Sequence, residues 1–167
     1  MDLLAAPYVA AALLLVVAGV AKALDPVPLA RALSLAGLPA RGPLLTPFVR
    51  VGAVAEAVVG GAAVVAPSAV TAGLVSASYL GFSVFVLRAL RSGSPLASCG
   101  CFGSVDTPPT VTHVVTTGAL ATVAAVVVAR PDGLVLTLPL LAVIGVLAYG
   151  VYLLLAVLPL VSPRAVR

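Results

Sequence analysis

Apolar residues in this chain form long runs, separated by short segments that contain proline, glycine or charged residues. Most runs are close to the ~20 residues that an α-helix needs to cross the hydrocarbon core of a bilayer. The pattern predicts five transmembrane helices, at residues 3–24, 48–66, 69–87, 111–129 and 134–161. The last run is longer than one span requires, which indicates tilt or extension beyond the bilayer.

The connections between these runs differ in length and in pattern. Pro26 and Pro28 end the first run, because proline cannot continue a helical hydrogen-bond ladder. Residues 27–37 then mix leucines with Arg31 and Ser34, which predicts a short amphipathic helix at the membrane interface. Only Pro67 and Ser68 separate the second and third runs, so these two helices are expected to form an antiparallel hairpin. The long polar connection is residues 88–110.

Composition strengthens this interpretation. The chain is 62% hydrophobic and 8% charged, whereas soluble domains carry about 25% charged residues. We therefore predict an all-α membrane protein with one integral membrane domain over residues 1–167. The first run is expected to be retained, because it lacks a basic leading region and is longer than the core of a signal peptide. The net charge of +4 does not indicate nucleic-acid binding, because the basic residues flank the apolar runs.

The distribution of basic residues predicts an orientation in a bacterial cytoplasmic membrane. With five spans, one side receives eight basic residues and the other only Arg130; the eight are Lys22, Arg31, Arg41, Arg50, Arg88, Arg91, Arg164 and Arg167. The positive-inside rule places the richer side in the cytoplasm, with the N-terminus outside and the C-terminus inside. Residues 88–110 would then face the cytoplasm, although disulfide-forming sites normally face an oxidising exterior.

The candidate chemistry centres on Cys99 and Cys101, the two cysteines of the chain, which Gly100 separates. A disulfide between them would close a very small, strained ring, and strain makes a disulfide easier to reduce. Arg88 and Arg91 are near in sequence, and positive charge favours the reactive thiolate. Two alternatives stay open: the thiolates could bind Cu(I), which prefers soft ligands, or the cysteines could be inert packing residues.

Two further residues are candidates for proton transfer. Glu56 lies in the middle of the second run, where an ionisable group is costly and often functional. Its expected partner is Tyr79, Arg50 or Lys22, and a purely structural hydrogen bond is the alternative role. His113 opens the fourth run, where it could act as a general base toward the cysteines or lie at the interface with a water partner.

Several other positions are expected to have structural roles. Tyr8 and Lys22, near opposite ends of the first run, suit the membrane interfaces. Gly52, Gly60 and Gly61 in the second run favour close helix packing.

The segment Cys99-Gly100-Cys101-Phe102-Gly103, following a run that ends near Arg88 and Arg91, resembles the MauE branch of the MauE/DoxX membrane proteins. Residues 19–26 and 37–39 and the glutamate at position 56 are similar to that family as well, and the resemblance covers most of residues 10–130. It implies a four-helix transmembrane bundle, often with a further helix, and action beside a thioredoxin-like partner. MauE itself is linked to maturation of methylamine dehydrogenase. One departure is His113, where family members often carry arginine.

The favoured hypothesis is a membrane thiol–disulfide or electron-transfer component. Cys99 and Cys101 would exchange with the CxxC motif of a thioredoxin-like protein and support maturation of a partner, with a membrane quinone as a candidate electron carrier. Glu56 and His113 would move protons, and Gly100, Phe102 and Gly103 would shape the segment. The alternatives are a Cu(I) relay through the same pair, and an assembly factor whose polar connection docks a partner.

Overall fold

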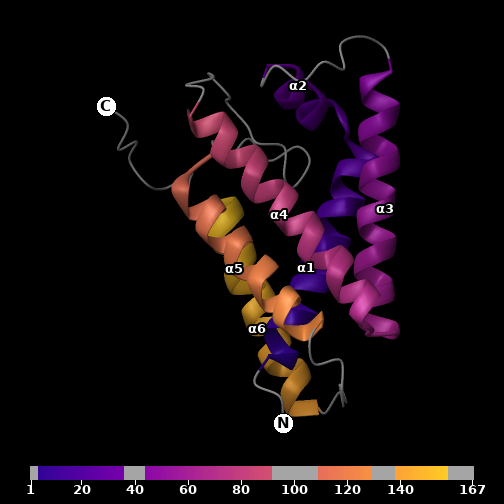
Figure 1. The fold of residues 1–167 in the computed structure, drawn as a ribbon, viewed down its shortest axis with the longest axis vertical. Helices are drawn as coiled ribbons and strands as arrows, with labels where there is room; N and C mark the ends of the chain where they lie inside the picture. Colours follow the sequence, from indigo (N-terminus) through magenta and orange to yellow (C-terminus); the bar gives the residue numbers. More distant parts are fainter. Residues whose placement is uncertain (1–3, 36–43, 92–108, 129–137, 158–167) are drawn as a thin grey trace.

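The computed structural model describes residues 4–35, 44–91, 109–128 and 138–157, with side chains from residue 140 in the last segment. The regular structure in these segments is helical. The elements are α1 (Ala5–Leu24), α2 (Val27–Leu35), α3 (Leu45–Val65), α4 (Ala69–Arg91), α5 (Val111–Val128), α6 (Leu138–Tyr152) and the π-helical turn η1 (Leu153–Val157), shown in Figure 1.

Five of these helical segments are long and apolar enough to cross a membrane, which confirms the predicted all-α membrane class. Two boundaries differ from the prediction by more than two residues. α3 begins at Leu45 because Pro47 falls in its first turn, where a missing N–H breaks no helical hydrogen bond. α4 continues to Arg91, so Arg88 and Arg91 belong to its last turn and not to the polar connection. Residues 36–37, 129, 134–137 and 158–161 of the predicted elements lie outside the described residues.

α1 is the central helix of the bundle. Within its most apolar 18 residues 56% are buried, against 22% in α3, 28% in α4 and α5, and 17% in the last span. α3 packs along α1, α5 packs along α4, and α6 also contacts α1 (Figure 1). α3 and α4 follow each other through a short turn at Ala66–Ser68 and run in opposite directions, as the predicted hairpin requires.

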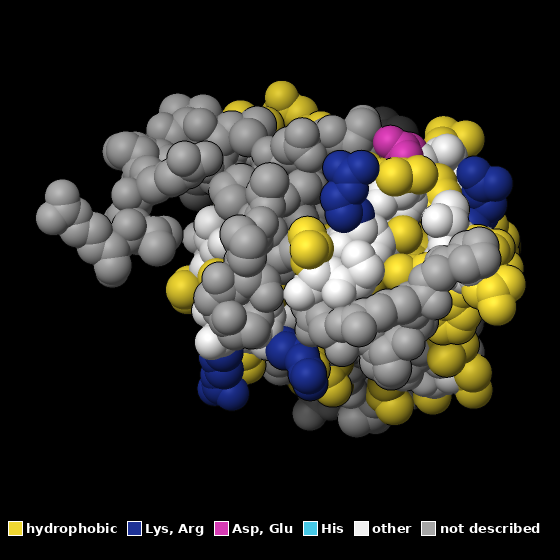
Figure 2. All heavy atoms as spheres, turned by 90° about the horizontal axis from the view of Figure 1, so that it is seen from above, with side chains coloured by type: hydrophobic (Ala, Val, Ile, Leu, Met, Phe, Trp, Pro, Cys, Tyr) yellow, Lys and Arg dark blue, Asp and Glu magenta, His cyan; other side chains and the backbone are white. Residues whose placement is uncertain are grey.

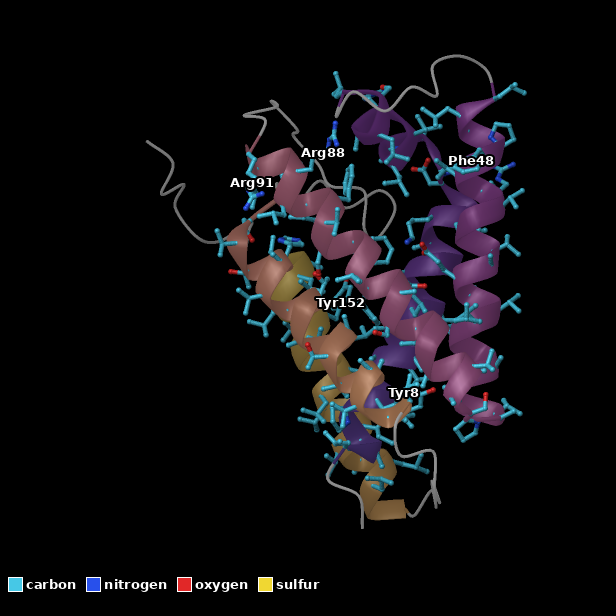
Figure 3. All side chains as sticks on the ribbon, in the orientation of Figure 1. Tyr8, Phe48, Arg88, Arg91 and Tyr152 are labelled. Atoms are coloured by element: carbon cyan, nitrogen blue, oxygen red, sulfur yellow. The ribbon has the colours of Figure 1, made fainter. Side chains whose placement is uncertain are left out.

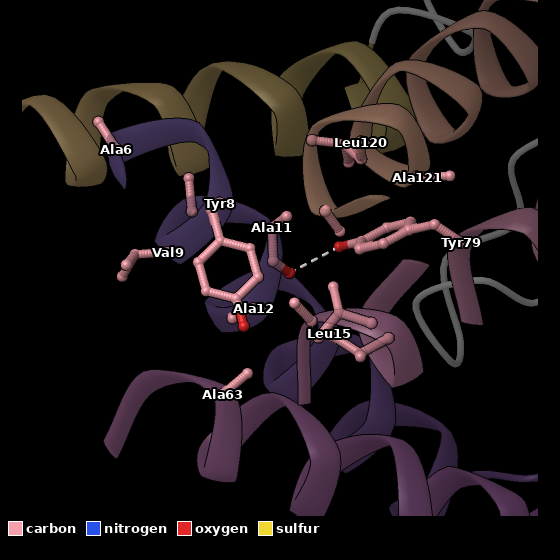
Figure 4. Close-up of a cluster of buried hydrophobic side chains, with 14 of the residues drawn as sticks. Ala6, Tyr8, Val9, Ala11, Ala12, Leu15, Ala63, Tyr79, Leu120 and Ala121 are labelled. Atoms are coloured by element: carbon pink, nitrogen blue, oxygen red, sulfur yellow. Dashed lines mark hydrogen bonds between the residues drawn. The ribbon is translucent and has the colours of Figure 1, made fainter. Parts of the chain in front are cut away.

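The core surrounds the first half of α1 (Figure 4). It contains Tyr8, Ala11 and Leu15 of α1 with Tyr79 of α4, and the Tyr79 hydroxyl donates a hydrogen bond of 2.7 Å to the carbonyl oxygen of Ala11. Tyr8 is fully buried in this cluster, so its predicted place at an interface is wrong. The reason is that α1 is covered by other helices, so a side chain near its end still points into protein.

Two glycines allow α1 and α3 to approach closely. A Cβ at Gly60 would lie 2.6 Å from the Ala12 carbonyl oxygen, and one at Gly19 would lie 2.7 Å from that of Ala53. No side chain larger than hydrogen fits at such separations without a shift of the backbone. Gly52 and Gly61, also predicted to favour packing, have open space around the equivalent position.

One end of the bundle carries the described basic residues, and we call it the basic end. Arg31, Arg50, Arg88 and Arg91 are exposed there, and Figure 2, which looks onto this end, shows Lys and Arg side chains spaced apart around it. α2 contacts the start of α3 through Ala30, Leu45 and Val49, with Leu29 and Leu33 beside them. The amphipathic segment therefore covers the bundle at this end.

Candidate functional site

A partly buried ion pair lies between α1, α3 and α4. Lys22 is 0% exposed, its Nζ forms an ion pair with Oε2 of Glu56, and the Glu56 side chain is 24% exposed. The same Nζ lies 4.1 Å from the centre of the Phe82 ring of α4, a cation–π contact. Of the three predicted partners of Glu56, the structure therefore has Lys22. The Tyr79 hydroxyl donates its hydrogen bond to the Ala11 carbonyl oxygen instead, and Arg50 donates to the Ala23 carbonyl oxygen.

The direction of helix α1 explains how the Lys22 side chain reaches the level of Glu56 in the middle of α3. Side chains on an α-helix tilt toward its N-terminus. Lys22 lies in the last turn of α1, so this tilt directs its stem away from the basic end and toward the middle of α3. The predicted interfacial position of Lys22 is therefore wrong. Bringing the two charges together inside the bundle avoids an isolated charge at low dielectric constant, which costs far more than a paired one.

His113 is the second buried polar group. It is 1% exposed, and its Nδ1 lies 2.8 Å from Oγ1 of Thr110, just before α5. One turn further, the Thr117 hydroxyl donates to the His113 carbonyl oxygen at 2.6 Å and lies 2.7 Å from the Ser83 hydroxyl of α4. His113 is therefore held inside the bundle, and its alternative place at the water interface is wrong.

A small cavity adjoins His113. It has a volume of about 30 Å³, enough for a water molecule. Helices α1, α4 and α5 and the turn η1 supply its lining, namely Leu14, Leu15, Ala18, Tyr79, Phe82, Val86, His113, Thr117 and Leu155. His113 Nε2 is buried and bonds to no described residue.

Phe82 joins the two buried sites, because one ring both contacts Lys22 and lines the cavity. Sequence reasoning did not single out Phe82 or Thr117 as parts of a site. Their spacing was the available signal: Phe82 lies three residues after Tyr79 and Thr117 four after His113, so each pair shares one helix face. Thr110, at the end of the polar connection, was missed as the His113 partner although it lies three residues before His113, a spacing that brings side chains together at a helix start.

Arg88 and Arg91 are exposed at the basic end, in the last turn of α4 (Figure 3). Cations in this position complement the partial negative charge of the helix C-terminus. The described chain resumes at Pro109, and α5 begins at the same end of the bundle (Figure 1). The predicted reactive segment, Cys99-Gly100-Cys101-Phe102-Gly103, lies outside the described residues.

Within the described segments, no three His, Cys, Asp or Glu side chains lie close enough to hold a metal ion. The fold and the two buried sites define a multi-pass α-helical membrane protein with charged and titratable groups inside its bundle. In a comparison with protein families, residues 2–130 match the family described as methylamine utilisation protein MauE. The chain therefore belongs to the MauE family. Neither the curated proteins nor the solved structures gave a match.

Proposed function

We propose that this protein is a membrane thiol–disulfide exchange component whose reactive pair is Cys99 and Cys101. The observation that carries the proposal is the Cys-Gly-Cys unit, which holds the two cysteines of the chain. It lies on the connection between Arg91 and Thr110, the ends of which are held at the basic end of the bundle. Membership of the MauE family supports a redox-related role in the maturation of another protein.

The proposed reaction transfers two electrons and two protons between two dithiol–disulfide couples. One thiolate of the reduced pair attacks a disulfide sulfur of a thioredoxin-like partner and forms a mixed disulfide, and one partner sulfur leaves as a thiolate. The second cysteine then attacks the mixed disulfide. Cys99 and Cys101 end as a disulfide, and the partner ends as a dithiol. The reverse sequence reduces the pair, so no further reactant is needed.

The surrounding residues would assist this exchange in different ways. Arg88 and Arg91 supply positive charge on the helix that leads into the reactive segment, which favours the thiolate. His113 follows the segment and is held by Thr110 through Nδ1, which supports a role as acceptor of the thiol proton. Glu56 is already paired with Lys22, which supports a positioning role for Glu56 more than proton delivery. Gly100, Phe102 and Gly103 would give the segment its shape.

The test is the trapping of a mixed disulfide with a thioredoxin whose second active-site cysteine is replaced by serine. The full-length protein should form this adduct, and Cys99→Ser with Cys101→Ser should abolish it, because no thiol remains. Ser98→Ala is the matched control and should leave adduct formation unchanged. A pair that never oxidises, together with full exchange in both serine variants, would contradict the proposal; stoichiometric copper lost in both variants would point to the Cu(I) relay instead.

We further propose that the basic end faces the cytoplasm of a bacterial cell, since basic residues concentrate there. A membrane-impermeant maleimide applied to intact cells should then leave Cys99 and Cys101 unlabelled, and permeabilisation should expose both. A Ser68→Cys variant that also carries Cys99→Ser and Cys101→Ser is the control, because Ser68 is exposed at the opposite end and should be labelled from outside. Labelling of the native cysteines in intact cells would reverse the assignment.

A further inference from the structure

A further site lies on the outside of the bundle, where α1 and α3 form an apolar groove of about 350 Å³. Its lining comes from the last turns of α1 and the middle of α3: Val20, Ala23, Leu24, Val54, Ala57 and Val58. Several of its larger side chains are exposed, Leu24 by 79% and Val58 by 64%. We call this feature the α1–α3 groove.

A cation is fixed at the head of this groove. Arg50, an exposed residue of α3, donates a hydrogen bond of 3.1 Å from Nε to the carbonyl oxygen of Ala23, which itself lines the groove. The other guanidinium nitrogens stay free to bind an anion, and Arg50 forms no ion pair with any residue that the structure describes. The acidic groups of the described segments are Asp25 and Glu56, and neither forms an ion pair with Arg50. Glu56 is paired with Lys22, and Asp25 lies just after the end of α1.

The groove follows the helix face below Arg50. The rise of an α-helix places Val54 about 6 Å and Val58 about 12 Å along the axis from Arg50, all on one face because they are four residues apart. The cation therefore lies at the basic end and the apolar groove runs from it toward the bilayer centre. A phospholipid has the same order, with its phosphate at the interface and its acyl chain below.

We propose that the α1–α3 groove binds an anionic phospholipid, with one acyl chain along the groove and the phosphate on Arg50. The bound carbonyl holds the guanidinium in place before binding, so little side-chain freedom is lost. Arginine suits phosphate because its planar fork donates two parallel hydrogen bonds. The apolar lining explains the chain, and Arg50 explains the preference for a net negative headgroup. This site is separate from the cysteine pair.

The absence of tryptophan from the chain allows a direct test. Val58→Trp places a single fluorophore at the rim of the groove, and Val84→Trp places one on the lipid-facing side of α4, where Val84 is 58% exposed. Each variant is reconstituted in phosphatidylcholine vesicles that contain either brominated phosphatidylglycerol or brominated phosphatidylcholine. For Val58→Trp, we expect brominated phosphatidylglycerol to bind about fivefold more tightly than brominated phosphatidylcholine. This ratio corresponds to the attraction between one basic residue and an anionic lipid surface. Val84→Trp should show no such preference.

Arg50 variants then identify the cation. In the Val58→Trp background, Arg50→Gln should remove the preference, Arg50→Lys should keep part of it, and Arg88→Gln should leave it unchanged. Unaltered quenching by brominated phosphatidylcholine in Arg50→Gln shows that α3 keeps its place. Equal quenching by both lipids at Val58→Trp, a preference that persists in Arg50→Gln, or the same preference at Val84→Trp would overturn the proposal. Protection of Val58→Trp from both lipids would also overturn it and indicate a second copy in the groove.

Discussion

Replacing Glu56 by leucine should destabilise the bundle by about 3–5 kcal/mol, because it leaves the Lys22 ammonium buried without its counter-charge. Lys22 is 0% exposed, and its stem is enclosed between α1, α3 and α4. The ammonium must then stay buried without a counter-charge or draw water into the bundle, and both cost free energy. The measurement is reversible unfolding of the purified protein in mixed micelles, read as a change in the free energy of unfolding.

The matched control is the double variant Lys22→Met with Glu56→Leu. Apolar residues of similar volume can replace a buried ion pair at little cost. The double variant should therefore be much more stable than Glu56→Leu alone, with part of the loss remaining from the Lys22 contact with Phe82. If the single and the double variants unfolded at the same denaturant fraction, the two charges would not be coupled. The comparison thus measures how much of the Glu56→Leu loss comes from the unpaired Lys22 charge.

Gly60→Ala should destabilise the bundle by about 1–3 kcal/mol, the usual cost of forcing extra volume into a packed contact. The added Cβ would meet the Ala12 carbonyl oxygen at 2.6 Å and a Val16 methyl at 2.9 Å. The backbone oxygen cannot turn away as a side chain would, so α1 and α3 must separate. The unfolding free energy in mixed micelles measures this effect as well.

Gly61→Ala is the control for Gly60→Ala, because it changes the next residue of the same helix in the same way. Nothing lies within 4 Å of a Cβ at Gly61, so the variant should gain about 0.5–1 kcal/mol from the better helix propensity of alanine. The two neighbouring substitutions should thus change stability in opposite directions. Equal effects would show that helix propensity, and not the α1–α3 contact, decides both results.

The spans could be predicted from the sequence because length and apolar character are local properties. The arrangement of the helices could not. Lipid is as apolar as the protein core, so a membrane helix carries no polar stripe that marks its outer face. The runs at residues 3–24 and 111–129 are similarly apolar, yet α1 is the buried centre and α5 lies at the periphery.

The site residues, too, could be predicted only in part from the sequence. The mid-membrane position of Glu56 predicted a partner, but choosing Lys22 over Tyr79 and Arg50 needs the neighbours of α3 and the inward direction of the Lys22 stem. His113 could be identified as a titratable residue, whereas its burial follows from packing against α1 and α4. Tyr8 and Lys22 were misplaced for one reason: position along a helix gives depth in the membrane but does not say which side of the helix is covered.

The Lys22–Glu56 pair also bears on how the chain enters the membrane. The two residues are 34 positions apart in sequence, so α1 leaves the ribosome well before the middle of α3. Until α3 arrives, the Lys22 ammonium has no counter-charge and stays near the headgroups, as an unpaired lysine does at a helix end. The pair seen in the folded bundle therefore requires α3 to lie beside α1. The ion pair thus links the burial of the Lys22 side chain to the packing of α3 against α1.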